Sequence, residues 1–222
     1  MKNGRKFIVV IHTSFVSVDH LRGLFSEIVP EAIVHHLVDD SLLADVMAAG
    51  RLTAPVTRRV CSYACLAEEM GADLLFNQCS SVGEAVNVAR TMIDIPYVKV
   101  DEPMAAEAVR LGRRIAVVAT VASTVGPSVR LVEEAAAAAG VAAAVKPVLV
   151  DGALDILMKE GNRDKHNQLV LEAIRRSEAD SDAIVLAQGS MVVLEPLLGS
   201  TRVPVLTSPR RGVINARRVL GL

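Results

Sequence analysis

The chain has 222 residues, 51% of them hydrophobic and 22% charged, a composition typical of folded globular proteins rather than disordered chains. Its 24 Lys and Arg balance 25 Asp and Glu, and it has no Trp, so we expect neither binding to a phosphate backbone nor stacking of bases on aromatic rings. Nucleic acid is therefore not an expected partner. No run reaches the roughly 20 apolar residues of a membrane-spanning helix, so a membrane is not expected either.

Short apolar runs rich in β-branched residues alternate with longer helical patterns along the whole chain. This alternation is typical of parallel sheets covered by helices. The predicted strands are, in chain order, residues 7–11, 32–37, 74–76, 97–100, 115–119, 144–149, 184–186 and 203–206. Because these runs are apolar on both faces, we expect all of them to be buried.

Cap and stop residues mark the ends of several helices between these strands. Ser17 is expected to cap the helix that follows the first strand. The other expected boundaries are Thr53 to Gly71, Asp101 to Gly112, a helix closed by Gly140, and a last helix from Ser208-Pro209 to about Leu220.

Three segments of the first half return in the second half in the same order. FIVVIHTS resembles RIAVVATV, LLFNQCSSVGE resembles IVLAQGSMVVLE, and IPYV resembles VPVL. The repeat predicts an α/β protein of two similar parallel-sheet, flavodoxin-like lobes related by a pseudo-twofold. We expect residues 1–100, completed by 207–222, to form one lobe and residues 101–206 the other, with a ligand cleft between them.

Cys79 is the strongest candidate for chemistry. It follows a predicted strand and precedes a helical pattern over residues 82–92. At such a place, backbone N–H groups and the positive end of the helix dipole favour an anion, either a thiolate or a substrate carboxylate. A thiolate can act as a nucleophile or accept a proton. The alternative is a buried, inert cysteine.

Small hydroxyl and amide side chains also follow other predicted strands, where we expect them to suit a small carboxylate ligand. The alternative for each hydroxyl is a helix N-cap. The candidate substrate-binding residues are Thr13, Ser14, Asn77, Ser80, Ser81, Thr120, Ser123, Thr124, Gly189 and Ser190.

We expect neither a bound cofactor nor a metal site. The chain has no GxGxxG and no GxxxxGK[ST]. Cys61 and Cys65 lie one helical turn apart and could contribute to a zinc site, but a packed helix face explains both. His35 and His36, adjacent in a strand, point to opposite faces and cannot chelate one ion together. Three cysteines, an odd number, favour a reducing cytoplasm over a disulfide scaffold.

In these residues the chain resembles the aspartate/glutamate/hydantoin racemase superfamily over nearly its whole length. The Asn77–Ser81 loop, the loop from Thr120 to Thr124, and the run VLAQGSM that contains Gln188 carry the resemblance. It implies two similar lobes that hold a small carboxylic acid, no cofactor, and a homo-oligomer. It also implies two cysteines, one from each lobe, of which one removes the α-proton and the other returns a proton.

The resemblance assigns Cys79 to the cysteine of the first lobe, and Thr120, Ser123 and Thr124 to a loop that holds a substrate carboxylate. The second cysteine is absent: Gln188 stands there, or Gly189 after a shift of one residue. An amide is neither a general acid nor a general base near neutral pH, but Gln188 can donate hydrogen bonds to a developing enediolate. His12 is the candidate for a second proton carrier. Its alternative role is a histidine bonded to backbone at the end of a strand.

These observations predict a cofactor-independent racemase or other isomerase of a small carboxylic or amino acid, with Cys79 as base or nucleophile and Gln188 and His12 as further catalytic candidates. A decarboxylase or lyase of a malonate-type acid, which needs only one proton donor, is the first alternative. A non-catalytic carboxylate-binding protein is the second. The identity of the acid is not predicted.

Overall fold

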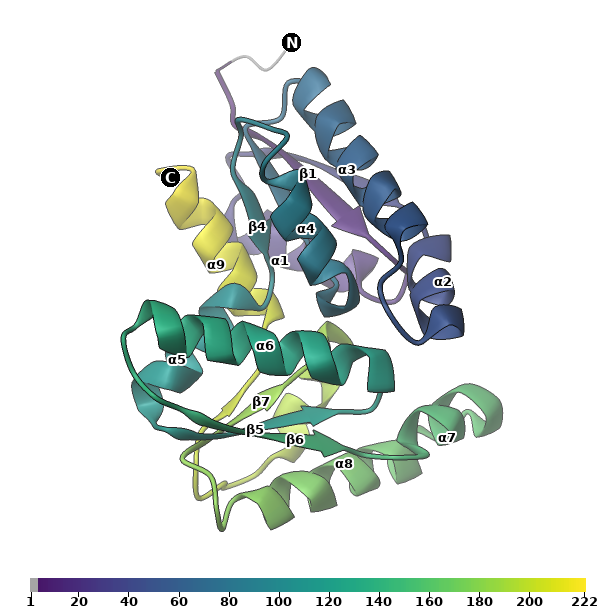
Figure 1. Ribbon diagram of the computed structural model, residues 1–222, viewed down its shortest axis with the longest axis vertical. Helices are drawn as coiled ribbons and strands as arrows, with labels where there is room; N and C mark the ends of the chain where they lie inside the picture. Colours follow the sequence, from purple (N-terminus) through teal and green to yellow (C-terminus); the bar gives the residue numbers. More distant parts are fainter. Residues whose placement is uncertain (1–3) are drawn as a thin grey trace. The chain divides into compact units, whose positions relative to one another are not determined.

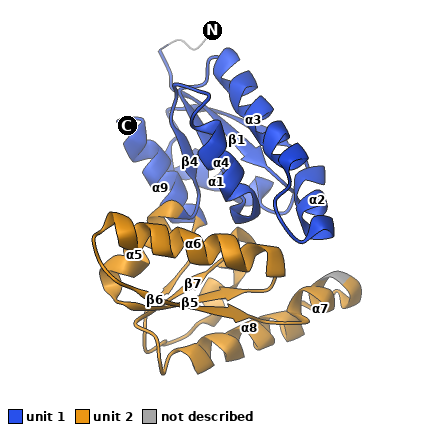
Figure 2. Ribbon diagram, in the orientation of Figure 1, with its two compact units in different colours: residues 1–101, 209–222 blue, residues 102–208 orange. Residues whose placement is uncertain are grey.

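The computed structural model describes residues 4–222, apart from the side chain of Met158. These residues form two compact α/β units (Figures 1 and 2). Unit 1 comprises the described residues up to Asp101 together with Pro209–Leu222, and unit 2 comprises Glu102–Ser208. Each unit contains one parallel sheet of four strands.

The sheet of unit 1 has the strand order β2-β1-β3-β4. Its strands are β1 (Phe7–His12), β2 (Ile33–Val38), β3 (Leu74–Asn77) and β4 (Tyr97–Lys99). Ile8 and Val10 pack with the helices α1 (Val18–Ile28) and α9 (Pro209–Val219), and we call this side the α1–α9 face. Val9 and Ile11 pack on the other side, the α2–α4 face, with α2 (Ser41–Ala49), α3 (Ala54–Glu69) and α4 (Gly83–Ala89).

The sheet of unit 2 has the strand order β6-β5-β7-β8. Its strands are β5 (Arg114–Ala119), β6 (Ala144–Leu149), β7 (Ala183–Leu186) and β8 (Val205–Leu206). One face packs with α5 (Glu102–Leu111) and α6 (Ala122–Ala138). The other packs with α7 (Ala153–Glu160), α8 (Arg163–Ser177) and the 3₁₀ segment η2 (Gly189–Leu197).

The strands of the two units are connected in the same order, and equivalent hydrogen bonds occur at equivalent positions. In unit 1 the backbone N of Phe7 donates to Asp73 Oδ2 at 2.7 Å; in unit 2 the N of Arg114 donates to Asp182 Oδ2 at 2.9 Å. The predicted pair of similar parallel-sheet lobes is thereby confirmed. Their pseudo-twofold relation and the cleft between them stay predictions.

The expectation that every strand is buried is wrong for β2, for β6 and for most of the run 203–206 that contains β8. Residues of β2 are mostly half-buried, and β6 is largely exposed. Both are edge strands, paired with β1 and β5 on one side only. Edge position alone does not expose a strand, since β4, the other edge strand of unit 1, is buried. Coverage depends on the strand order and on the elements packed over each edge, and a single run contains neither.

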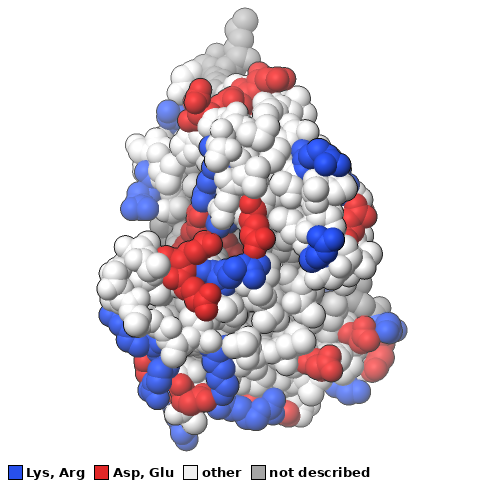
Figure 3. All heavy atoms as spheres, in the orientation of Figure 1, with Lys and Arg blue, Asp and Glu red and all other residues white. Residues whose placement is uncertain are grey.

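The molecular surface carries both signs of charge. Basic and acidic side chains are interspersed on the face drawn in Figure 3, in keeping with the formal net charge of −1. Among residues 4–222, no helix is long and apolar enough to cross a bilayer.

Two residues expected to cap helices stand at the predicted positions, but their side chains do not make the expected capping hydrogen bonds. Thr53 directly precedes α3 and Ser17 directly precedes α1, yet neither side chain makes a capping hydrogen bond. The hydroxyl of Thr57 donates to the Thr53 carbonyl oxygen at 3.1 Å, and the Ser17 hydroxyl donates to Gln78 Oε1 at 2.8 Å. Ser17 therefore links the start of α1 to the segment after β3.

Gly112 follows α5 as predicted, but its role is steric. A Cβ built there lies 2.1 Å from the Cβ of Asp182, whose carboxylate accepts hydrogen bonds from the backbone of Arg113 and Arg114. We therefore expect Gly112→Ala to lower the free energy of unfolding by about 2 kcal/mol, because relieving the overlap displaces these bonds. Urea unfolding measures this.

The matched control is Gly23→Ala in α1, where an added Cβ meets no atom within 4 Å. An alanine in a helix interior is expected to stabilise the protein there by up to about 1 kcal/mol. Equal effects of the two substitutions would contradict the steric explanation.

Candidate functional site

Cys79 lies at the carboxyl edge of the sheet in unit 1. One residue separates it from the end of β3: Gln78, whose backbone N donates to the Ile11 carbonyl oxygen at 3.3 Å. Cys79 itself is extended, with φ −124° and ψ 118°, and directly precedes the short 3₁₀ turn η1 (Ser80–Val82). Chain direction thus places the thiol where polar groups following β1, β3 and β4 meet.

The thiol is half-buried and has polar neighbours. The hydroxyl of Thr13 and both the N–H and the hydroxyl of Ser81 hydrogen-bond to the sulfur. Asn77 Nδ2 donates to the Cys79 carbonyl oxygen at 2.9 Å and so holds the loop. On its apolar side, Cys79 packs against the core of the α2–α4 face.

The surroundings of the sulfur favour the neutral thiol. Burial raises the pKa of Cys79, and the negative charge of Asp101 raises it further, while the bonds from Thr13 and Ser81 lower it. The net direction is upward. A helix N-terminus was expected to favour the thiolate, but the element after Cys79 is a three-residue 3₁₀ turn, whose dipole is small.

Asp101 is a site residue that sequence reasoning took only as a helix cap. It directly precedes α5, and its carboxylate oxygen Oδ2 accepts a hydrogen bond from the Ser80 hydroxyl. The side chain is almost fully buried. The register of β3 and β4 is what brings these two loops together, since Asn77 pairs with Lys99.

Gln78 is a second residue that the prediction missed. Its amide joins the loop after β1 to the end of β3: Nε2 donates to Thr13 Oγ1 at 3.3 Å, and Oε1 accepts from Ser17. Ser14, the neighbour of Thr13 in this loop, is half-buried. The predicted residues of unit 1 other than His12 thus lie in the loop after β1 and in the segment from the last residue of β3 to η1.

His12 is placed away from Cys79. Alternation along β1 directs its side chain to the α1–α9 face with Ile8 and Val10, whereas Cys79 packs on the α2–α4 face. It is fully buried, and its Nε2 lies 2.8 Å from His36 Nδ1. Burial, then the neighbouring His36 and Arg22, lower the pKa of His12 to about 4. The imidazole is neutral at pH 7, and its partner is a side chain rather than backbone.

In unit 2, Gln188 is bound to Thr120 by two hydrogen bonds. Gln188 Oε1 accepts from the backbone N of Thr120 at 3.0 Å, and Nε2 donates to Thr120 Oγ1 at 3.1 Å. Gly189 and Ser190 begin the 3₁₀ segment η2 directly after it.

Strand register shows which residue of unit 2 corresponds to Cys79. Asp73 N donates to the first residue of β1 and Asp182 N to the first residue of β5, both at 2.7 Å. Cys79 and Gln188 each lie six residues beyond these aspartates. Gln188, and not Gly189, therefore occupies the equivalent position, and its bonds to Thr120 correspond to the contact of Cys79 with Thr13.

Ser123 and Thr124 lie in the first turn of α6, at the carboxyl end of β5. The residue in the N-cap position is Val121, so neither hydroxyl caps this helix. Ser123 Oγ is buried and has no hydrogen-bond partner among the described residues. Polar groups at a helix N-terminus of this kind can bind a carboxylate.

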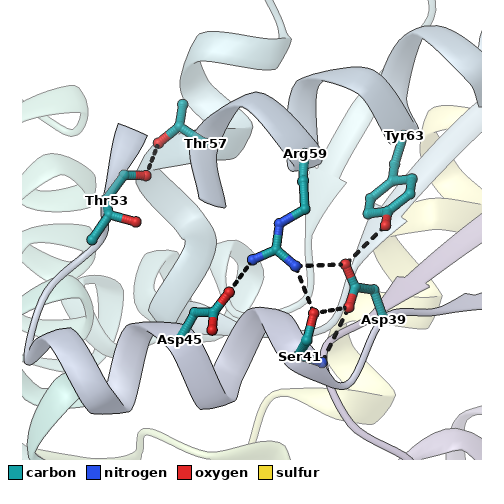
Figure 4. Close-up of polar contacts among 7 residues, drawn as sticks. All are labelled: Asp39, Ser41, Asp45, Thr53, Thr57, Arg59 and Tyr63. Atoms are coloured by element: carbon teal, nitrogen blue, oxygen red, sulfur yellow. Dashed lines mark hydrogen bonds and ion pairs between the residues drawn. The ribbon is translucent and has the colours of Figure 1, made fainter. Parts of the chain in front are cut away.

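A separate polar cluster ties α2 and α3 to the end of β2 (Figure 4). Arg59 on α3 bridges Asp39 and Asp45, and the hydroxyl of Tyr63 donates to Asp39 Oδ2 at 2.8 Å. Asp39 also accepts from the Ser41 hydroxyl. Every charged group of this cluster is paired with another member, which indicates a role in holding the helices.

No group of three or more His, Cys, Asp or Glu side chains with metal-binding geometry occurs among residues 4–222. Cys61 is buried on the inner side of α3 and Cys65 is half-buried; both are free thiols. His35 stacks edge-on against Phe7 while His36 faces His12, so the two adjacent histidines do point to opposite faces of the sheet.

Comparison with known proteins places these features in a family. The family model "Asp/Glu/Hydantoin racemase" matches residues 8–214. A search of curated proteins found no significant match.

Solved structures share the fold at low sequence identity. Glutamate racemase isoform RacE1 from Bacillus anthracis is 16% identical with a TM-score of 0.78, and the match covers 97% of this chain and 82% of that one. Allantoin racemase from Klebsiella pneumoniae is 21% identical with a TM-score of 0.63, covering 98% and 89%. Aspartate racemase from Picrophilus torridus is 14% identical with a TM-score of 0.67, covering 97% and 94%. On the family match over nearly its whole length, the chain belongs to the Asp/Glu/hydantoin racemase family.

Proposed function

We propose that the protein is a cofactor-independent racemase or other isomerase of a small carboxylic or amino acid, with Cys79 as its base or nucleophile. Family membership supports the reaction class. The observation that carries the assignment of Cys79 is its position: a half-buried thiol at the carboxyl edge of a parallel sheet, hydrogen-bonded by Thr13 and Ser81.

The substrate is held, in this proposal, by hydroxyl and backbone groups that follow β5 in unit 2 and β3 in unit 1. Thr120, Ser123 and Thr124 bind a carboxylate, as the buried Ser123 hydroxyl without a hydrogen-bond partner suggests. Gln188 directs one N–H to Thr120, which leaves the other to donate to a developing enediolate. Asn77, Ser80 and Ser81 shape the loop around Cys79. His12, neutral and on the far face of the sheet, is given no proton-transfer step.

A test uses single enantiomers of small amino and carboxylic acids in deuterated water. Removal of the α-proton by Cys79 is expected to place solvent deuterium at the α-carbon, detected by proton NMR or mass spectrometry, with formation of the other enantiomer. An absence of exchange across acidic, neutral polar and apolar acids would contradict the proposed racemase.

Decarboxylation of a malonate-type acid is the second candidate, and two observations favour it. The position equivalent to Cys79 holds an amide, and the raised pKa of Cys79 keeps its thiol protonated. Loss of carbon dioxide needs one proton donor, which a single thiol provides. Carbon dioxide release without α-proton exchange in the product acid distinguishes this reaction from racemisation.

We also propose a cytoplasmic location and a homo-oligomer. The three cysteines are free thiols, which suits a reducing compartment. The oligomer follows from the resemblance to the family alone. Sedimentation of the purified protein measures it, and a monomer at micromolar concentration would contradict it.

A further inference from the structure

Unit 1 contains a cavity of about 320 Å³ between α1 and the edge strand β2. Phe25 on α1 and Val34 on β2 give it an apolar wall, and Arg22 and His36 also line it. Val34 and His36 lie two positions apart on β2 and are both half-buried, so they point to the same α1–α9 face and border this space. The volume is near the lower end of the range of small-molecule sites, about 300–1,000 Å³.

Two arginines make the lining of the cavity positive. Arg5 donates from Nε to the Glu31 carbonyl oxygen at 2.9 Å and from Nη2 to that of Ala32 at 2.7 Å. Carbonyl groups are neutral, so these bonds fix the guanidinium without cancelling its charge. Arg22 Nη1 lies 2.7 Å from Asp19 Oδ1, but both side chains are exposed and such a surface ion pair is weak. A ligand anion can therefore compete for Arg22.

The hydrogen bond between His36 and His12 determines which nitrogen of His36 carries a hydrogen. His36 Nδ1 and His12 Nε2 are 2.8 Å apart, and His12 Nδ1 is buried without a hydrogen-bond partner among the described residues. If His36 donated, His12 Nδ1 would be a buried N–H without an acceptor, which is rarer than an unsatisfied acceptor. His12 Nε2 therefore donates, and His36 carries its hydrogen on Nε2. This N–H is left for a ligand in the cavity.

The other charged groups around the cavity have partners or point elsewhere. Two ion pairs at 2.6 Å join α9 to α1 and to the residues after it, Arg210 with Glu27 and Arg217 with Glu31. His35 adjoins His36 in β2 but points to the opposite face of the sheet. Asp19, as the ion-pair partner of Arg22, is the carboxylate that competes with a ligand anion.

We propose that this cavity binds a small organic acid, whose carboxylate accepts hydrogen bonds from Arg22 and His36 Nε2 and whose apolar part packs against Phe25 and Val34. Guanidinium and imidazole N–H groups favour an anion, and the apolar wall favours a ligand that is more than an inorganic ion. Cys79 packs on the opposite face of the sheet. The inference therefore goes beyond the proposed function and does not depend on it.

The test is a titration of the isotope-labelled protein with benzoate, followed by two-dimensional NMR at constant ionic strength. The backbone signals of Ser26 and Val34, which line the cavity, are expected to shift with a saturable dependence on benzoate. Benzamide has the same shape without the charge, and acetate has the charge without the ring. Each is expected to bind at least about tenfold more weakly than benzoate. Shifts confined to the segment around Cys79, or equal binding of benzamide, would overturn the proposal.

Two substitutions at one ion pair are expected to act in opposite directions. Arg22→Gln removes a charged donor and is expected to weaken benzoate binding about tenfold, whereas Asp19→Asn removes the competing carboxylate and is expected to strengthen it. Both side chains are exposed, so the fold is expected to persist. The matched control is Arg176→Gln on α8, an exposed arginine 3.9 Å from Glu172 in unit 2, with parental affinity expected. Parental affinity in Arg22→Gln, or an equal loss in the control, contradicts the site.

The ring signals of His36 provide a readout that weak surface binding would not change. Burial and then Arg22 lower the pKa of His36 in the free protein. A carboxylate bound at Nε2 favours the imidazolium, so saturating benzoate is expected to raise this pKa. An unchanged titration of His36 in the complex overturns the proposal. Cys79→Ala is expected to keep both the affinity and the shift of the His36 titration, which separates this site from a carboxylate site at the thiol.

Discussion

Cys79→Ala is expected to lower the rate of solvent deuterium exchange into the substrate by on the order of 10³-fold or more, because it removes the one thiol of the candidate site. General acid–base groups typically contribute about 10²- to 10⁴-fold, and a nucleophile more. Ala leaves Thr13 and Ser81 in place, and the lost contact lies at the rim of the core rather than in its centre. The fold is therefore expected to survive, as measured by circular dichroism and thermal melting.

The matched control is Cys65→Ala on α3, a half-buried free thiol of the same chemistry. Its exchange rate is expected to equal that of the parent. Equal losses in both variants would point to damage of α3 and its packing, and not to a reacting thiol at Cys79.

Cys79→Ser refines the result. A hydroxyl fills nearly the same space and accepts the same hydrogen bonds, but its proton is far less acidic than that of a thiol. We expect ligand binding close to that of the parent with exchange as weak as in Cys79→Ala. A serine variant with parental turnover would show that turnover needs no thiol and would contradict the role assigned to Cys79.

Much of the fold follows from local patterns in the sequence. The runs that form β1, β3, β5 and β7 are buried central strands, because burial on both faces requires continuous apolar sequence. The edge strands β2 and β6 carry similar runs and were expected to be buried as well. Their exposure depends on their place at a sheet edge and on how that edge is covered, since the edge strand β4 is buried, and both are properties of the whole unit.

The candidate site was predictable only in part, for a similar reason. A cysteine after a strand is visible in the sequence, and so are the hydroxyls beside it. The bond from Ser80 to Asp101 joins residues 21 positions apart and requires β3 and β4 to be neighbours. The alignment of the internal repeat was also wrong by one position. Matching identical residues aligned Gln78 with Gln188, whereas the strand register aligns Cys79 with Gln188.

The pairing of His12 with His36 is another contact that no local pattern predicts. It depends on the parallel register of β1 and β2, in which Val10 pairs with His36 and His12 with Val38. Both imidazoles lie on the α1–α9 face, and each has a lowered pKa, chiefly because of burial. A proton on either ring therefore repels the other and the nearby Arg22.

This pair predicts a loss of stability in mild acid. The pKa of His12 is about 4 in the folded protein against 6.5 as its ordinary value, so the unfolded chain binds a proton first as the pH falls. The stabilisation is complete above pH 6.5 and is lost progressively toward pH 4, with a total of about 3 kcal/mol from His12. Urea unfolding at a series of pH values between these limits measures the slope.

The source of this slope can be isolated with two substitutions. His12→Leu keeps an apolar group of similar size on the α1–α9 face and is expected to flatten the pH dependence of the unfolding free energy, even if its stability at pH 7 is lower. His20→Gln, on the exposed side of α1, is the matched control and is expected to keep the parental slope. A slope that persists undiminished in His12→Leu would show that other titrating groups, and not the His12 imidazole, govern acid unfolding. A slope that disappears would establish His12 as a neutral structural histidine at neutral pH, and Cys79 would remain the group to which proton transfer in this unit is assigned.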